Sequence, residues 1–142
     1  MQDYKRKINY YETDKMGITH HSNYIRLMEE ARVDFLEQVG YGYDRWEREG
    51  ISSPVIGVEG EYKRSTTFDD VIRIHTEVAE YQRVRLTIAY TMYNDQTGEI
   101  VFTGKSRHCF LNTAGRPMAL EKNYPELDRL LKELVKKEKQ TE

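Results

Sequence analysis

The stretch that decides the interpretation of this chain runs from Tyr10 to Tyr24 and reads YYETDKMGITHHSNY. It places one acid, Asp14, in a loop that leads straight into a helical pattern. Ser22 or Asn23 can cap that helix, because a short side-chain oxygen accepts a hydrogen bond from an otherwise unpaired amide. A carboxylate near a helix N-terminus lies beside unpaired N–H groups and the positive end of the helix dipole. Those N–H groups can bind an oxyanion while the acid attacks or activates water, so the stretch predicts a hydrolase site.

The same residue types are also common in loops that do no chemistry. Asp, Thr, Gly, His and Asn favour turns and helix caps, because their short side chains bond to nearby backbone groups or tolerate unusual backbone angles. The local pattern alone leaves both interpretations open, and the rest of the chain has to decide between them.

Length and composition predict one folded domain spanning residues 1–142. The 22 basic and 24 acidic residues give a net charge of −2, so no basic excess suggests nucleic acid as a partner. No apolar window reaches the length that spans a bilayer, and the first residues lack the apolar core of a signal peptide. The single cysteine, Cys109, excludes an intrachain disulfide and fits a reducing compartment. We expect a cytoplasmic protein without a membrane span.

Helical periodicity marks a long helix that begins near Tyr24 and ends at Gly40, a short one over residues 44–48, and a last one that begins at Pro125. Apolar residues recur in these segments at three- and four-residue steps, which is typical of a helix with one buried face. The face of the long helix consists of Tyr24, Leu27, Met28, Ala31, Phe35 and Val39, and that of the last helix of Leu127, Leu130, Leu131, Leu134 and Val135.

Four segments after Pro54 favour strands. Residues 55–64, 71–80, 83–93 and 100–112 are predicted, and the alternation of apolar residues in the last two is typical of half-buried antiparallel strands. A shorter first strand is expected over residues 4–11. One long helix with such a sheet predicts the α+β class. The sheet edges would be left unpaired, so we expect a homo-oligomer, a dimer or tetramer, that continues the sheet.

Three motifs occur in an order and at a spacing that resemble a known family. They are Asp14-x-x-Gly17-x-x-x-His21-x-x-Tyr24 followed by Glu30-Ala31-Arg32, then Glu61-Tyr62 through Phe68-Asp69-Asp70-Val71, then Tyr81-Gln82-Arg83. From about residue 5 to residue 124 the chain resembles the hotdog-fold acyl-CoA thioesterases of the 4-hydroxybenzoyl-CoA thioesterase and YbgC-like type. That resemblance implies a long antiparallel sheet wrapped around one central helix, with a C-terminal helix. Where the family often has a proline, this chain has Lys63-Arg64-Ser65-Thr66, which affects the local loop shape.

The resemblance also implies roles for individual residues. Asp14 would be the nucleophile or general base, Gly17 would allow a tight turn beside the acyl group, and the peptide N–H of His21 would polarise the thioester carbonyl. Tyr24 would line the pocket. The hydroxyl of Ser65, from the neighbouring subunit, would touch the thioester sulfur. The phosphates of an acyl-CoA would be bound by four cations, Lys63, Arg64, Arg83 and Arg85. An acyl-carrier-protein thioester is the alternative substrate.

Several alternatives remain open at this point. A metal is not expected, because adjacent His20 and His21 rarely converge with Asp14 on one ion and no fourth ligand is evident. No cofactor is implied. A hotdog hydratase or dehydratase, a non-catalytic acyl-CoA-binding module, and a thioesterase whose catalytic acid is Glu29 or Glu30 on the helix are rival interpretations. The Asp14 motif favours hydrolysis.

Overall fold

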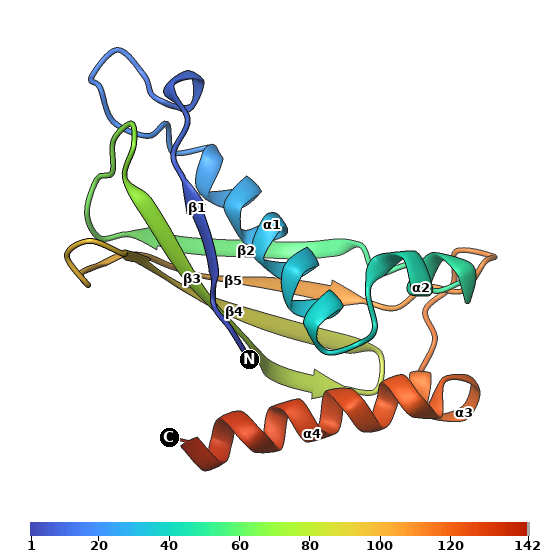
Figure 1. Ribbon diagram of the computed structural model, residues 1–142. Coiled ribbons are helices and arrows are strands. Elements are labelled where there is room, and N and C mark those ends of the chain that lie inside the picture. The colour runs from blue at the N-terminus through green and yellow to red at the C-terminus, as the bar shows by residue number, and fades with distance from the viewer. Residues whose placement is uncertain (142) are drawn as a thin grey trace. The chain divides into compact units, whose positions relative to one another are not determined.

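The computed structural model describes residues 1–141, with side chains up to residue 137, as five strands and a set of helices (Figure 1). The sheet has the order β1-β3-β4-β5-β2, with β1 paired antiparallel to β3. Strand β2 is therefore at one end of the order and the short β1 at the other. The elements are β1 Tyr4–Lys7, the 3-10 helix η1 Tyr10–Glu12, α1 Asn23–Gln38, α2 Tyr43–Arg48, β2 Val55–Tyr62, β3 Val71–Gln82, β4 Arg85–Asn94, β5 Ile100–Cys109, α3 Leu120–Asn123 and α4 Pro125–Thr141.

The predicted long elements are confirmed, and most of their predicted ends lie within three residues of the observed ones. Helix α1 ends before Gly40, whose φ of 84° is the left-handed value expected there. The expected first strand over residues 4–11 is wrong in its second half. Strand β1 stops at Lys7, because Asn9 donates its backbone N–H to the Glu12 carboxylate at 2.8 Å and closes a 3-10 turn. Helix α3 was not predicted, since four residues carry too little periodicity to reveal it.

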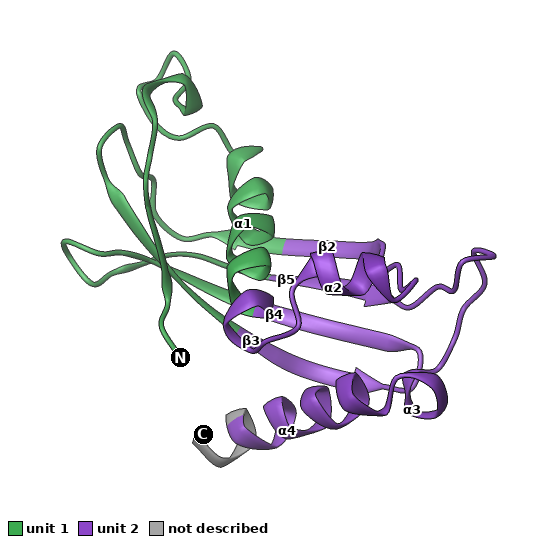
Figure 2. Ribbon diagram, turned by 45° about the vertical axis from the view of Figure 1, so that its right-hand side comes forward, with its two compact units in different colours: residues 1–35, 60–76, 90–104 green, residues 36–59, 77–89, 105–142 purple. Residues whose placement is uncertain are grey.

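The chain forms two compact units, and the boundary between them crosses α1 and the four long strands (Figure 2). Unit 1 consists of Met1–Phe35, Gly60–Thr76 and Tyr90–Gly104. Unit 2 consists of Leu36–Glu59, Glu77–Ala89 and Lys105–Glu142. Within residues 1–141, no helix is long and apolar enough to cross a membrane.

Unit 1 buries the apolar stripe of α1 against its strands. The alternation predicted for β4 is observed, because Tyr90 and Met92 are buried while their neighbours are more accessible. In β5 it begins only at Phe102, because Val101 is buried as well and Ile100 is exposed. Arg32 on α1 donates to the Tyr90 hydroxyl at 3.0 Å, so this buried cation has a partner inside the core. The buried residues of α1 in this unit are Asn23, Tyr24, Leu27, Met28, Ala31, Arg32 and Phe35.

Arg6 holds the N-terminal part of unit 1 together. Its guanidinium contacts both carboxylate oxygens of Glu12 in η1 and both of Glu30 in α1, and Tyr4 donates a further hydrogen bond to Glu30 at 2.9 Å. Glu12 is only 4% exposed. Hydrogen bonds from Arg6 lower the pKa of Glu12 and of Glu30, whereas burial and Glu30 raise the pKa of Tyr4 to about 12. The cluster therefore holds two ionised carboxylates around one cation.

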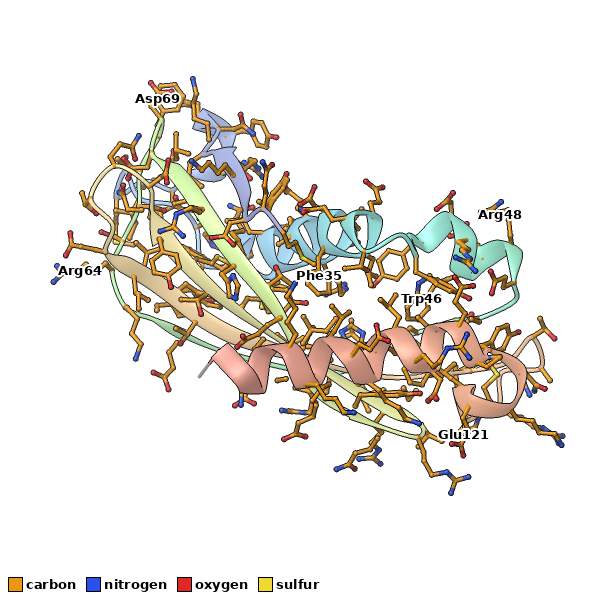
Figure 3. The ribbon with its side chains drawn as sticks, turned by 60° about the horizontal axis from the view of Figure 1, so that its bottom comes forward. Phe35, Trp46, Arg48, Arg64, Asp69 and Glu121 are labelled. Carbon is orange, nitrogen blue, oxygen red and sulfur yellow. The ribbon has the colours of Figure 1, made fainter. Side chains whose placement is uncertain are left out.

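Unit 2 is built around Trp46, which points into the structure in Figure 3. Its indole N–H donates to the carbonyl of Tyr41 at 2.8 Å, and its ring lies 6.1 Å from that of Phe110. Helix α4 buries Leu127 and Leu131, while Asp128 accepts a hydrogen bond from the Tyr81 hydroxyl on β3 at 2.5 Å. The predicted start of this helix at Pro125 is confirmed.

We predict that Arg6→Met lowers the free energy of unfolding by about 3 kcal/mol at pH 7, because it leaves a buried carboxylate without its counter-charge. The pKa values of Glu12 and Glu30 are lowered in the folded state, so their contribution is present above the unfolded pKa of about 4.3 and is lost as the pH falls through the folded pKa. Urea unfolding of both proteins from pH 7 downward should therefore show the difference shrinking in acid.

The matched control for this experiment is Lys7→Met. Lys7 is the next residue, its side chain is 63% exposed, and its ion pair with Asp69 spans 3.6 Å at the surface. We expect a change below about 0.5 kcal/mol, as for most exposed pairs. Equal losses for the two variants would contradict the role assigned to Arg6.

Candidate active site

The Asp14 loop of unit 1 is a tight hairpin. Thr13 and Thr19 pair across it, the Asp14 N–H donates to the carbonyl of Ile18 at 2.9 Å, and the Gly17 N–H donates to the carbonyl of Asp14 at 2.9 Å. Gly17 has a φ of 81°, a conformation that favours glycine. The Asp14 carboxylate is anchored through one oxygen, Oδ1, which accepts the N–H of Met16 at 2.8 Å. The loop thus holds the acid through Oδ1, while Oδ2 has no hydrogen-bond partner among the described residues.

The start of α1 supplies a backbone donor next to this acid. The His21 N–H donates to no acceptor among residues 1–141, whereas the Asn23 N–H donates to the carbonyl of His20 at 3.0 Å. The side chains expected to cap the helix are engaged elsewhere. Ser22 bonds the ring of His20 at 2.8 Å, and the Asn23 amide donates to the carbonyl of Glu12 at 2.9 Å. The His21 amide is therefore available to a ligand.

A pocket of about 340 Å³ lies between the Asp14 loop, the start of α1 and the segment after β2, all within unit 1. It contains six of the residues that the sequence selected, and Gly17 lies in the same loop without lining the pocket. Arg83 and Arg85 do not line it, and both belong to unit 2. The lining residues are Asp14, Met16, Ile18, Thr19, His21, Tyr24, Tyr62, Lys63, Arg64 and Ser65.

The end of β2 and the segment after it are joined by hydrogen bonds to the start of α1 and to the Asp14 loop of the same chain. The Tyr62 hydroxyl donates to the carbonyl of His21 at 3.0 Å, and the Thr67 hydroxyl donates to the carbonyl of Gly17 at 2.7 Å. The resemblance implied that Ser65 reaches the site from a neighbouring subunit. In the structure one chain brings Ser65 to the pocket that Asp14 lines, so their meeting does not depend on a second copy.

Three aromatic rings pack together at the site, and two of them, Tyr24 and Tyr62, line the pocket. Tyr24 stacks on Phe102 with ring centroids 5.1 Å apart, and Tyr62 meets both rings edge-on at 5.3 and 5.2 Å. Gly60 permits this cluster, because a Cβ at that position would lie 2.3 Å from Phe102 Cζ. Sequence analysis found Tyr24 but missed Phe102 and Gly60. Their only signal was an alternating strand pattern, which does not reveal contacts between strands.

The cations of the pocket are exposed and already paired with acids. Lys63 lies 2.5 Å from a Glu61 oxygen, and Arg64, which projects outward in Figure 3, lies 2.8 Å from Glu99. Because exposed ion pairs contribute little stability, these cations can exchange a carboxylate for a phosphate at small cost. In unit 2, Arg83 and Arg85 are exposed at the turn between β3 and β4, and Arg83 has a φ of 24°.

The acids of α1 are placed differently from Asp14. Both oxygens of Glu30 are bound by Arg6, and neither Glu29 nor Glu30 lines the pocket. The structure therefore gives no support to the alternative in which an acid of the helix is catalytic. Among the described residues, no three histidine, cysteine or acidic side chains gather as a metal site.

Comparisons with known proteins agree with this geometry. Residues 8–136 match the family model described as the thioesterase-like superfamily. This chain belongs to that superfamily. YneP of Bacillus subtilis, which is named as a candidate acyl-CoA thioesterase, is 30% identical over 84% of this chain and 87% of its own length. A DHNA-CoA thioesterase structure from Staphylococcus aureus is 27% identical, covers 99% of this chain and 95% of its own, and has a TM-score of 0.92.

A further relative extends the similarity to a protein of the predicted type. The acyl-CoA thioesterase YbgC of Helicobacter pylori is 22% identical over 85% of this chain and 95% of its own length. The predicted α+β hotdog fold is confirmed by these similarities, and so is the prediction of a thioester hydrolase.

Proposed function

We propose that this thioesterase hydrolyses an acyl-CoA to the free acid and coenzyme A in the Asp14 pocket. The observation that carries the proposal is the presence of the Asp14 carboxylate and the available His21 amide on the walls of one pocket. A thioester hydrolase needs both a group that attacks or activates water and a donor for the oxyanion. The names of the Bacillus and Staphylococcus relatives support CoA as the thiol. A carrier-protein thioester offers the same bond and is the alternative substrate.

The His21 N–H would donate a hydrogen bond to the thioester carbonyl oxygen. That bond strengthens as the oxygen becomes negative in the tetrahedral intermediate, so it lowers the barrier rather than only binding the substrate. The adjacent N-terminus of α1 adds the positive end of its dipole. The hydroxyl of Ser65 would donate to the departing sulfur, which carries away the electron pair of the broken C–S bond.

Asp14 can act by two routes. As a general base it takes a proton from water, the hydroxide oxygen bonds to the carbonyl carbon, and the C–S bond breaks to release thiolate. As a nucleophile it bonds to that carbon itself, thiolate leaves, and water then opens the mixed anhydride to regenerate the carboxylate. Label found in Asp14 after a single turnover in ¹⁸O-labelled water identifies the second route, because it enters the carboxylate only when water attacks the aspartyl carbonyl of the anhydride.

The rival functions make different demands on this site. A hydratase would need a histidine positioned as acid or base; the ring of His20 bonds to Ser22, whereas His21 lines the pocket. Assays for enoyl-CoA hydration and for thiol release therefore distinguish the two activities. A non-catalytic acyl-CoA-binding module would bind the substrate without releasing any thiol.

We also propose that the protein is a homo-oligomer that pairs through β2. This strand ends the sheet order, and it exposes Val55, Ile56 and Val58 by 40–50% of their surface. An edge strand presents unpaired N–H and C=O groups to solvent, and a second copy of β2 would satisfy them across a twofold axis.

The first prediction for the proposed activity is that Asp14→Asn lowers kcat at least about a hundredfold, the scale of a general acid or base contribution. The change keeps the size of the side chain and one acceptor oxygen, so the fold should persist. Thiol release from a panel of acyl-CoA esters measures the loss, with Glu29→Gln as a control on an exposed acid of α1. Near-parental turnover by Asp14→Asn, or a loss confined to Glu29→Gln, would exclude Asp14 as the catalytic acid.

The second prediction concerns the cations. Arg64→Ala and Lys63→Ala should each raise KM for acyl-CoA several-fold with little change in kcat, because phosphate contacts bind the substrate and the transition state alike. The same acyl group on pantetheine lacks the nucleotide phosphates, so its KM should not change. If a variant loses activity equally toward acyl-CoA and acyl-pantetheine, the substituted residue supports the fold or the acyl pocket instead.

The third prediction is that Val58→Lys shifts the oligomer toward smaller species, because a charged lysine on an edge strand opposes strand pairing. Sedimentation velocity at micromolar concentration measures the change. The control is Ile100→Lys, which alters a similarly exposed apolar residue at the start of β5. A parent protein that is monomeric and fully active would contradict the proposal.

A further inference from the structure

Three buried hydroxyl groups form a chain beside the Asp14 pocket. The Tyr24 hydroxyl lies 2.9 Å from Thr66 Oγ1, and Thr66 Oγ1 lies 2.6 Å from Thr19 Oγ1. Their residues are 3%, 2% and 5% exposed. Burial raises the pKa of Tyr24, so its hydroxyl remains a neutral donor at ordinary pH. Thr66 is the middle member of this row of three hydroxyls, and it is not among the residues that line the pocket.

Thr66 connects the Asp14 loop to the start of α1, the two parts of the site whose separation must be kept. On one side, Thr19 pairs with Thr13, the residue before Asp14, and the Thr19 N–H also donates to the carbonyl of Thr66 at 2.8 Å. On the other side, Tyr24 belongs to the first turn of α1, three residues after His21. One hydroxyl therefore bonds both the base of the acid loop and the helix turn that follows the amide donor.

We propose that Thr66 is a positioning residue that fixes the separation between the Asp14 carboxylate and the His21 amide. This inference rests on the proposed function of those two groups. A thioester must meet the acid and the oxyanion donor at the same time, and a misplacement of about 1 Å can lower the rate about a hundredfold. The hydroxyl of Thr66 can serve both neighbours, because it has one donor hydrogen and two acceptor lone pairs.

Thr66→Val tests the proposal, since it removes the hydroxyl and keeps the shape. We expect kcat to fall at least about tenfold while KM stays within about twofold, as for a group that acts through the geometry of the transition state. Thr66→Ser restores the hydroxyl and should recover kcat to within about threefold of the parent, a rescue that a purely structural role of the methyl group would not give.

Thr76→Val is the matched control. Thr76 is also a buried threonine of unit 1, on β3, and its hydroxyl has no hydrogen-bond partner among the described residues. The same substitution there should leave kcat unchanged. Thr19→Val, which removes another member of the hydroxyl chain, should lower kcat in the same way as Thr66→Val. When Thr66→Val and Thr19→Val are combined, the two losses of kcat should be less than additive on a logarithmic scale, because both substitutions remove the same hydrogen bond.

The outcomes separate this inference from the proposed function. If Asp14→Asn is inactive but Thr66→Val keeps the parental kcat, Thr66 is not a positioning residue. The inference also fails if Thr66→Ser is as impaired as Thr66→Val, or if the loss is in KM alone. If Thr66→Val does not fold, Thr19→Val decides the question by the same split between kcat and KM. An active Asp14→Asn protein would overturn the proposed function itself.

Discussion

The contact of Arg6 with Glu12 and Glu30 is the constraint on which the rest of unit 1 depends. Glu12 precedes the Asp14 loop and Glu30 lies on α1 beyond it, so one guanidinium on β1 binds both flanks of the segment that carries the candidate site. A loop held at both ends has few conformations left to lose on binding a substrate. The tight hairpin at Asp14 and the exposed amide at His21 can then persist without a ligand.

Sequence reasoning predicted what depends on local pattern. The buried stripe of α1 and the buried positions of β4 and of most of β5 could be predicted, because burial follows the period of the element. The end of the first strand was predicted wrongly because it depends on Glu12, whose carboxylate is bound by Arg6 of β1 and by the backbone N–H of Asn9. No window of sequence shows that two acids will share one cation.

The same limit applies to the candidate site. The motif from Asp14 to Tyr24 contains most of the chemistry in one stretch, so the acid, the glycine and the amide donor were accessible from sequence. Phe102 and Thr66 reach the site from segments far along the chain, through ring packing and a buried hydroxyl bond. Ser65 was selected by resemblance, yet its place beside Asp14 within a single chain was not foreseen.

The close approach of Gly60 to Phe102 links the aromatic rings at the pocket to the start of α1. Any larger residue at position 60 would displace the Phe102 ring, and Tyr24 and Tyr62 rest against that ring. Tyr62 also donates to the carbonyl of His21, and Tyr24 bonds Thr66. A larger residue at position 60 would therefore disturb the wall of the pocket and the start of α1 together, so the size of this one residue constrains the geometry of the candidate site.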